Sequence, residues 1–499
     1  MIATQAEKSR IASTLKAFDL LPARIDDVTA NSREARAGSA FLAYPGGARD
    51  GRDFISDALT RGASAVLFDD DNFTWKPEWK VPHQAVPALK NQASHIAGHV
   101  YGAPSDALWM VGVTGTNGKT SIAQWVADAL DKAGRKTAVL GTIGNGFVGQ
   151  LSASDNTTPD AILLQRLLRG FCNAGASACV MEVSSHGLAQ GRVADIKYDV
   201  AIFTNLTRDH LDYHGTMEAY GKAKSILFAA RGLKHAVINI DDDFGRALAT
   251  RVRASGVPVT AFASESGRGD ADLAADDIKV SARGLSFTVR DVCGIAKVES
   301  GVLGAFNVSN LLAVIGALKA SGFSLAEAAR AVSVLQPVTG RMQTLRVAGK
   351  PLTVIDYAHT PDALDKALAT VKAIVPRHAR LISVFGCGGD RDRGKRPLMG
   401  AISAKWADLT IATSDNPRTE SPAQILADIT PGLGAAPYRL VEDRQQAIYE
   451  ALNDARADDI VVIAGKGHED YQIVGTTKHH FSDVEIATEA LANWQGRAR

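Results

Sequence analysis

The stretch Leu108-Trp-Met-Val-Gly-Val-Thr-Gly-Thr-Asn-Gly-Lys-Thr120, continued by residues 121–132, decides the fold of this 499-residue chain. Its first six residues are an apolar run typical of a buried strand, and apolar side chains recur at helical spacing through 121–132. The glycines between them allow a tight turn whose backbone N–H groups converge on phosphate oxygens at a helix N-terminus. Lys119 would neutralise phosphate charge, and Thr120 would ligate Mg²⁺. Val113 stands where a strict P-loop has glycine, so we predict a variant phosphate loop rather than a chance Gly-Lys-Thr.

Working outward, the same alternation of apolar runs and helical patterns recurs through the chain, at residues 178–183, 200–205, 236–240, 352–355, 381–385, 409–413 and 460–464. It predicts an α/β protein with parallel sheets covered on both faces. Loop-forming residues at 101–106 and 336–340 divide the chain into three predicted domains, 1–104, 105–337 and 338–499. Residues 264–300 contain short alternating patterns, and two interpretations stay open there: a small β excursion or a surface insertion.

Composition excludes several classes of protein. Hydrophobic residues make up 46% and charged residues 22%, which argues against disorder, and a net charge of +1 argues against a global surface for nucleic acid. The four cysteines form no CxxC pair, which fits a reducing compartment. No apolar stretch of about 18 residues occurs, and the first twenty residues lack a hydrophobic signal region. We therefore expect a cytoplasmic protein without membrane insertion.

Two polar segments follow the apolar runs in the middle of the chain. Glu182 stands at the carboxyl end of one predicted strand, and His210 lies in the segment that leaves the next. Open α/β sheets bind ligands at this edge, so both side chains are candidate Mg²⁺ ligands beside the phosphate loop. Lys224, in contrast, lies in a predicted helix, where a lysine is usually a solvated surface charge.

These residues belong to motifs that resemble the Mur ligases, which use ATP to form amide bonds in peptidoglycan precursors. The matching segments are Gly115-Thr-Asn-Gly-Lys-Thr120, Glu182-Val-Ser-Ser-His186, Thr204-Asn205 with Asp209-His-Leu-Asp212, Phe306-Asn-Val-Ser-Asn310, Thr339-Gly-Arg341 and Asp356-Tyr-Ala-His359. The resemblance implies a three-domain, monomeric architecture: an N-terminal UDP-binding domain, a central P-loop-type ATPase domain and a C-terminal Rossmann-like domain.

A narrower resemblance concerns the family members that add a diamino acid to UDP-MurNAc-L-Ala-D-Glu. Its motifs are Asn156-Thr-Thr-Pro159, Tyr213-His-Gly215, Gly386-Cys-Gly-Gly-Asp-Arg-Asp392, Asp415-Asn-Pro-Arg418 and Gly465-Lys-Gly-His-Glu469. It implies three small-molecule substrates, namely ATP, UDP-MurNAc-L-Ala-D-Glu and meso-2,6-diaminopimelate. They would react through an acyl phosphate to give the UDP-MurNAc-tripeptide used in cell-wall synthesis, and hence in cell shape and division.

The resemblance also implies the roles of individual residues. Catalysis would use Lys119, Glu182, His210 and Lys224, the last carbamylated by CO₂, and Mg²⁺ would be held by Thr120, Glu182, His210 and the carbamate. ATP would contact Gly115, Thr116, Asn117, Gly118, Lys119, Thr120, Ser121, Asn307, Arg341, Asp356 and His359. The sugar nucleotide would contact Ala30, Ser32, the loop 47–49, Asn156, Thr157, Thr158, Ser184, Gln190 and Arg192. Diaminopimelate would contact Arg391, Asp415, Asn416, Pro417, Arg418, Gly465 and Glu469.

The predicted identity of the acceptor amino acid depends on Arg418. Diaminopimelate differs from lysine by a distal carboxylate, and a guanidinium offers it a planar fork. A lysine-adding relative would leave that arginine unpaired, which is costly in a pocket.

Three alternatives stay open: the segment 415–418 is an ordinary turn, Arg341 forms a structural ion pair, or the chain joins lysine or a folate-like acceptor. A nucleotide-binding regulatory protein without ligase chemistry is a further alternative.

Overall fold

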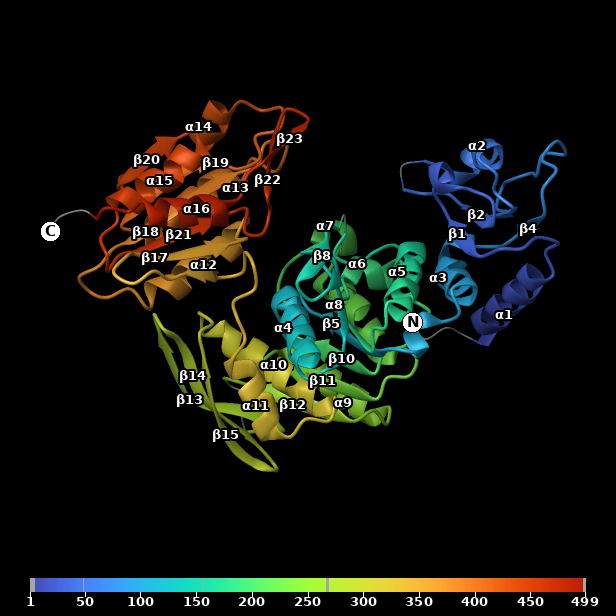
Figure 1. Cartoon of the computed structure of the whole chain (residues 1–499), viewed down its shortest axis with the longest axis horizontal. Helices are drawn as coiled ribbons and strands as arrows, with labels where there is room; N and C mark the ends of the chain where they lie inside the picture. Colours follow the sequence, from blue (N-terminus) through green and yellow to red (C-terminus); the bar gives the residue numbers. More distant parts are fainter. Residues whose placement is uncertain (1–4, 48, 155, 266–268, 497–499) are drawn as a thin grey trace. The chain divides into compact units, whose positions relative to one another are not determined.

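The computed structural model describes residues 5–47, 49–154, 156–265 and 269–496. The chain forms two compact units (Figure 1): residues 1–275, 290–294 and 309–328 make up the first, and residues 276–289, 295–308 and 329–499 the second. No described helix is both long and apolar enough to cross a membrane.

The first unit begins with a small parallel sheet in the order β1-β2-β3-β4. Its strands are β1 (Asp27–Thr29), β2 (Ser39–Ala43), β3 (Ala65–Phe68) and β4 (His83–Ala85). Helices α1 (Gln5–Asp19) and α3 (Leu89–Val100) bury apolar side chains on one face, and α2 (Ile55–Thr60) does so on the other. Strands β2 and β3 are buried along their whole length, as expected for a parallel sheet covered on both sides.

The large sheet of the first unit is built around β5 (Trp109–Thr114), the strand expected before the phosphate loop. Its parallel part runs β13-β12-β11-β10-β5-β9-β6, where the first residues of β13 (Leu273–Ser281) pair with β12, and it continues into an antiparallel edge, β7-β8. The strands are β6 (Thr137–Leu140), β7 (Asn145–Phe147), β8 (Gln150–Ser152), β9 (Ala178–Glu182), β10 (Val200–Phe203), β11 (His235–Asn239) and β12 (Val259–Ala263). The predicted parallel α/β class is confirmed.

Helices cover both faces of this sheet. α5 (Ala161–Asn173) and α9 (Asp243–Ala254) pack into one core, α4 (Lys119–Lys132) packs against β5, β6 and β9, and α10 (Phe306–Ala320) places Gly316 against Val237. The remaining helices are α6 (Ser185–Ala189), α7 (Leu211–His214), α8 (Met217–Ser225) and α11 (Leu325–Ser333). The segment with two open interpretations contains three strands: β13 (Leu273–Ser281), which begins in the first unit, β14 (Gly284–Asp291) and β15 (Gly294–Ser300).

The second unit contains a doubly covered sheet in the order β16-β17-β21-β18-β19-β20, parallel except for β16. Its strands are β16 (Gln343–Leu345), β17 (Leu352–Asp356), β18 (Leu381–Cys387), β19 (Leu409–Ser414), β20 (Tyr438–Val441) and β21 (Ile460–Ala464). Helices α12 (Pro361–Lys372), α13 (Lys395–Trp406) and α14 (Pro422–Leu433) fill one core, and α15 (Arg444–Asp454) and α16 (Asp483–Ala492) fill the other. A hairpin, β22 (Tyr471–Val474) and β23 (Thr477–His480), follows β21.

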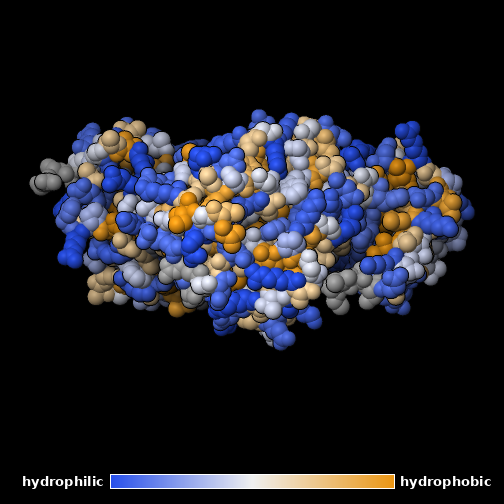
Figure 2. Space-filling model, turned by 90° about the horizontal axis from the view of Figure 1, so that it is seen from below, coloured by the Kyte–Doolittle hydropathy of each residue, from blue (hydrophilic) through white to orange (hydrophobic). Residues whose placement is uncertain are grey.

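The surface of the molecule agrees with the composition of the chain. Hydrophilic side chains are interspersed with small hydrophobic areas on the face seen in Figure 2, as the 22% of charged residues leads one to expect.

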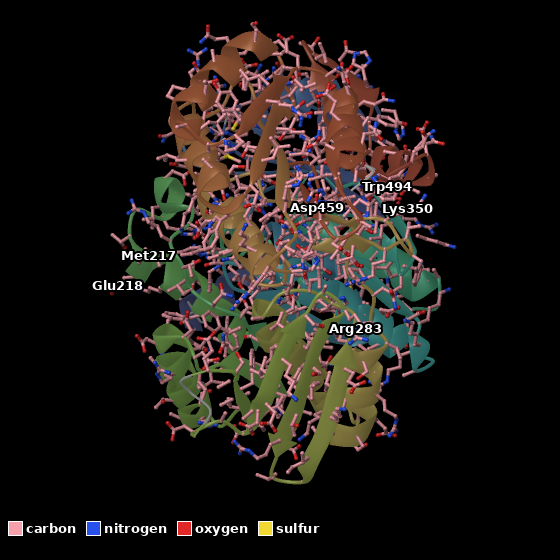
Figure 3. All side chains as sticks on the ribbon, turned by 90° about the vertical axis from the view of Figure 1, so that its left-hand side faces the viewer. Met217, Glu218, Arg283, Lys350, Asp459 and Trp494 are labelled. Carbon is pink, nitrogen blue, oxygen red and sulfur yellow. The ribbon has the colours of Figure 1, made fainter. Side chains whose placement is uncertain are left out.

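Trp494 and Lys350 lie near each other in Figure 3. The Trp494 indole donates to the carbonyl of Leu452 (2.9 Å), and the Lys350 ammonium donates to that of Ala492 (3.2 Å), which fastens the end of α16 to its unit.

Candidate active site

The phosphate loop joins β5 to α4 and needs glycine at two positions. Gly115 (φ 148°) and Gly118 (φ 88°) adopt backbone angles that other residues rarely take. The Lys119 ammonium donates to the carbonyls of Gly115 (3.1 Å) and Thr116 (2.8 Å). The loop therefore has its cation in place at the N-terminus of α4, where phosphate oxygens are favoured.

Two residues at the end of the neighbouring strand brace this loop. Thr204 Oγ1 donates to the carbonyl of Asn117 (2.6 Å), and Asn205 accepts from the N–H groups of Thr116 and Asn117 through its carbonyl (2.9 Å) and side chain (3.0 Å). A Cβ on Gly115 would lie 1.8 Å from Thr204 Oγ1, so the close contact with Thr204 leaves room only for glycine at position 115. Both residues belong to a motif of the sequence that did not by itself reveal this role; the signal is polar residues directly after an apolar strand.

Glu182 connects the phosphate loop with the next strand end. Its carboxylate accepts from Thr120 Oγ1 (2.9 Å) and from the N–H of Thr142 (2.8 Å), and the side chain is almost fully buried. A buried carboxylate beside a hydroxyl is a set of hard oxygen donors that fits Mg²⁺, whose other ligands are usually water and substrate phosphates. Thr142 was missed because it follows β6 in a short turn without a recognisable motif.

Lys224 is not the solvated charge that its position on α8 alone predicts. Its side chain is 1% exposed, its Nζ donates to the Gly115 carbonyl (2.8 Å), and it lies 4.1 Å from the ring centre of Tyr220. Burial, with the positive charge of Lys119 adding to it, lowers the pKa of Lys224 to about 6. The amine is therefore largely uncharged at neutral pH. Lys222, on the same helix, is exposed to solvent.

His210 is placed differently from Thr120 and Glu182. It is exposed, has a positive φ of 52°, and its Nε2 lies 3.4 Å from Asp209 Oδ2. Its ring centre is 4.8 Å from that of His186. Among the described residues, no group of three or more His, Cys, Asp or Glu side chains forms a ready-made metal site. The role of His210 as a ligand stays a prediction.

The residues predicted to contact the sugar nucleotide gather beside Glu182. Thr158 Oγ1 donates to the Glu182 carbonyl (2.8 Å) and accepts from the N–H of Ser184 (2.9 Å). Arg192 donates to the Thr158 carbonyl (2.7 Å) and to Gln190 Oε1 (2.7 Å).

Other predicted contacts of the sugar nucleotide are placed less closely. Thr157 and Thr142 share a hydroxyl contact (3.0 Å), and Asn156 is exposed at the start of the segment. After β1 of the small sheet, Ala30 is exposed and Ser32 is buried in a short 3₁₀ turn. Ala48, in the predicted loop 47–49, lies outside the described residues.

Four residues predicted to contact ATP lie in the second unit. The Arg341 guanidinium is 4.9 Å from the ring centre of Tyr357, and its buried Nε has no hydrogen-bond partner within the described part of the chain. Asp356 accepts from the N–H of Met342 (2.7 Å), and Asn307 donates to the Leu303 carbonyl (2.7 Å). His359 is exposed, with Nδ1 2.8 Å from the Tyr357 carbonyl. The Nε–H of Arg341 therefore stays a hydrogen-bond donor that a ligand oxygen can use.

The residues predicted to contact the acceptor lie where β18, β19 and β21 end. Asp415 and Asn416 are buried directly after β19, followed by the buried Pro417, and Asn416 Nδ2 donates to Glu469 Oε2 (3.0 Å). Arg418 has a φ of 50° and donates to the Gly389 carbonyl (2.8 Å).

A second arginine lies beside Arg418. A Cβ on Gly388 would lie 3.1 Å from Arg418 Nη1 and 3.6 Å from Arg391 Cγ, so the two arginines flank the same glycine. Lys466 lies beside Asp415 and Glu469, and the sequence alone did not indicate it, although it stands between Gly465 and Gly467 after an apolar strand.

Comparisons with known proteins define the class. Residues 24–101 match the model described as "Mur ligase family, catalytic domain", residues 113–318 the "Mur ligase middle domain" and residues 340–467 the "Mur ligase, glutamate ligase domain". The chain belongs to the Mur ligase family, which confirms the resemblance and the expected fold class.

Within this family, similar relatives share one name, UDP-N-acetylmuramoyl-L-alanyl-D-glutamate–2,6-diaminopimelate ligase. The relative from Chromobacterium violaceum is 50% identical over 474 residues (95% of each chain), and that from Neisseria meningitidis serogroup A is 51% identical over 462 residues (92% of this chain and 94% of the relative). A solved structure with this name is 37% identical, with a TM-score of 0.71 over 94% of this chain and 95% of that one. A MurF ligase from Thermotoga maritima in complex with ADP shares the fold, at 18% identity and a TM-score of 0.64 over 94% of this chain and 97% of that one.

Proposed function

We propose that this chain is an ATP-dependent ligase that joins meso-2,6-diaminopimelate to UDP-MurNAc-L-Ala-D-Glu, giving the UDP-MurNAc-tripeptide, ADP and phosphate in peptidoglycan synthesis. The observation that carries the choice of acceptor is Arg418, whose guanidinium donates to the Gly389 carbonyl and flanks Gly388 with Arg391, in the same group of strand-end loops as Asp415 and Glu469. This pocket offers a guanidinium to a carboxylate and carboxylates to ammonium groups, as a diamino diacid requires. The names of relatives about 50% identical support the same reaction.

The reaction has two steps. The free side-chain carboxylate of the dipeptide attacks the γ-phosphorus of ATP, so that ADP leaves and an acyl phosphate forms. The amine of the acceptor then attacks the acyl carbon, the tetrahedral intermediate loses phosphate, and the amine gives up a proton. Both steps depend chiefly on positioning and on stabilising negative charge.

The first unit supplies the residues for the phosphoryl step. Lys119 and the loop N–H groups would hold the phosphates, and Glu182 with Thr120 would hold Mg²⁺. Mg²⁺, when bound, would neutralise negative charge on the phosphate oxygens. Thr158, whose hydroxyl is fixed by the Glu182 backbone, would orient the dipeptide toward the same place.

We assign Lys224 the role of a carbamate. Its uncharged amine can attack CO₂, forming a C–N bond and releasing one proton, which turns a neutral amine into a carboxylate beside Gly115. With His210, this carboxylate would complete the oxygen and nitrogen donors around the phosphates. We also propose that the enzyme acts as a monomer in the cytoplasm, consistent with its four free cysteines.

The test is phosphate release from ATP with UDP-MurNAc-L-Ala-D-Glu and either meso-diaminopimelate or L-lysine. Release with diaminopimelate and little with lysine is expected. Preferred use of lysine would keep the ligase chemistry and refute the acceptor assignment. No release with either acceptor would favour another acceptor, such as a folate-like one, or a protein that binds nucleotide without ligation.

A further inference from the structure

Lys466 has a fully buried side chain at the base of the acceptor pocket, and no step described above uses it. Its exposed fraction is 0%, which is rare for lysine unless the ammonium is paired. It follows β21 in a turn with positive φ at Gly465 (120°) and Gly467 (55°). A Cβ on Gly467 would lie 2.7 Å from Tyr357 Cβ, so the turn packs tightly and encloses the lysine between its two glycines.

The ammonium of Lys466 contacts the groups that are expected to hold the acceptor. Its Nζ donates to Asn416 Oδ1 (3.1 Å) and to the Tyr471 carbonyl (2.6 Å). It lies 3.5 Å from Asp415 Oδ1 and 3.6 Å from Glu469 Oε2. One buried cation is thus shared by three pocket side chains that come from two different strand ends.

These contacts fix the orientation of the Asn416 amide. Its oxygen accepts from Lys466 and from the N–H of Ile473 (2.9 Å), which leaves its nitrogen to donate to Glu469 Oε2 (3.0 Å). Without the ammonium, the amide loses one of the two donors that decide between its two orientations. The ammonium also lies against the carboxylates of Asp415 and Glu469 and offsets one of the two negative charges of this pair.

We infer that Lys466 is a positioning residue for acceptor recognition: it fixes the orientation of Asn416 and the charge of the Asp415–Glu469 pair at the end of the pocket that receives an ammonium group. This inference rests on the acceptor assignment proposed above. Lys466 is placed to act on the binding of the diamino acid and not on the formation of the acyl phosphate, whose predicted residues include Lys119, Glu182 and Lys224.

The experiment compares Lys466→Met, Lys466→Gln and the control Lys478→Met. Lys478 is an exposed lysine of β23 in the same unit, and its ammonium also lies near the Tyr471 ring (4.3 Å), so it controls for loss of a nearby lysine. The half-reaction is measured separately, without acceptor: hydroxylamine attacks an acyl phosphate and releases phosphate, so the hydroxamate formed from ATP and UDP-MurNAc-L-Ala-D-Glu reports the first step.

For Lys466→Met we expect the KM for diaminopimelate to rise about tenfold or more, because a hydrogen-bonded charge is removed from the pocket. The KM values for ATP and the sugar nucleotide and the hydroxamate yield should match wild type. Lys466→Gln, whose amide can still donate to Asn416, should lose less, and Lys478→Met should lose nothing.

An unchanged KM for diaminopimelate in both Lys466 variants would overturn the inference. Loss of hydroxamate formation in both would show a structural role and would overturn it as well. If the wild-type enzyme itself forms no hydroxamate, the proposed function fails, and this result is distinct from a failure of the variants alone.

Discussion

The pKa of Lys224 leads to a quantitative prediction about its reaction with CO₂. Only the uncharged amine reacts. With a pKa of about 6, roughly 97% of Lys224 is uncharged at about pH 7.5, whereas an ordinary lysine with a pKa of 10.5 is about 0.1% uncharged. The reactive fraction is therefore about a thousandfold larger for Lys224 than for a solvated lysine. Lowering the pH through about 6 protonates the amine, so the carbamate should be lost below that pH.

The assay is ¹³C NMR of the enzyme equilibrated with ¹³C-labelled bicarbonate. We expect one carbamate signal in the wild-type protein at about pH 7.5 and its disappearance near pH 5. Lys224→Met should abolish the signal. Lys222→Met should retain it, because Lys222 is exposed to solvent on the same helix and does not lie in the buried environment of Lys224.

Two results would refute this reasoning. A carbamate signal that survives in Lys224→Met would place the reactive amine elsewhere. Absence of the signal from the wild-type protein at about pH 7.5 would show that burial beside the Gly115 carbonyl does not make the amine available to CO₂. Turnover of Lys224→Ala, measured with and without a small carboxylate, adds a second check, because partial rescue is expected only if the carboxylate matters.

Three further predictions concern other parts of the site. Glu182→Gln should raise the Mg²⁺ concentration needed for half-maximal phosphate release about 100-fold, since a carboxylate ligand becomes neutral; an unchanged Mg²⁺ titration would remove Glu182 from the metal site. Gly118→Ala should raise the KM for ATP about tenfold, because the backbone has φ 88° and the new Cβ would lie 2.5 Å from Asn310 Oδ1; equilibrium titration with ATP should show the same loss, and wild-type affinity would contradict it. Arg418→Ala should raise the KM for diaminopimelate about ten- to a hundredfold and leave the weak use of lysine unchanged; an equal loss with both amino acids would refute recognition of the distal carboxylate.

Much of the fold could be predicted because strands buried on both faces are readable as apolar runs. The runs at 178–183, 381–385 and 460–464 each coincide with an observed strand. The strand expected at 200–205 ends at Phe203, because Thr204 and Asn205 turn away to hold the phosphate loop. The β7–β8 edge has no such run, since three-residue strands with partly exposed side chains carry no periodic signal.

The site was predictable only where a motif carries the chemistry. Thr120 and Glu182 were expected near each other from their strand ends, and the structure joins them by a hydrogen bond. The environment of Lys224 could not be read from the helix that carries it, because burial there comes from packing beside Gly115, more than a hundred residues earlier in the chain. Lys466 was missed for the same reason: its partners Asn416 and Glu469 come from separate strand ends.

Glu182 has a consequence for inhibitor design. Its carboxylate accepts a hydrogen bond from the Thr120 hydroxyl, and its backbone carbonyl accepts one from the Thr158 hydroxyl. A single residue therefore connects the side expected to hold the phosphates with the side expected to hold the dipeptide. The separation of the two subsites is then set by the covalent dimensions of one buried residue and cannot adapt to a ligand. A compound that links a phosphate mimic to a dipeptide mimic needs a short, rigid spacer of one fixed length, and such a spacer avoids the entropy cost that weakens flexible two-headed ligands.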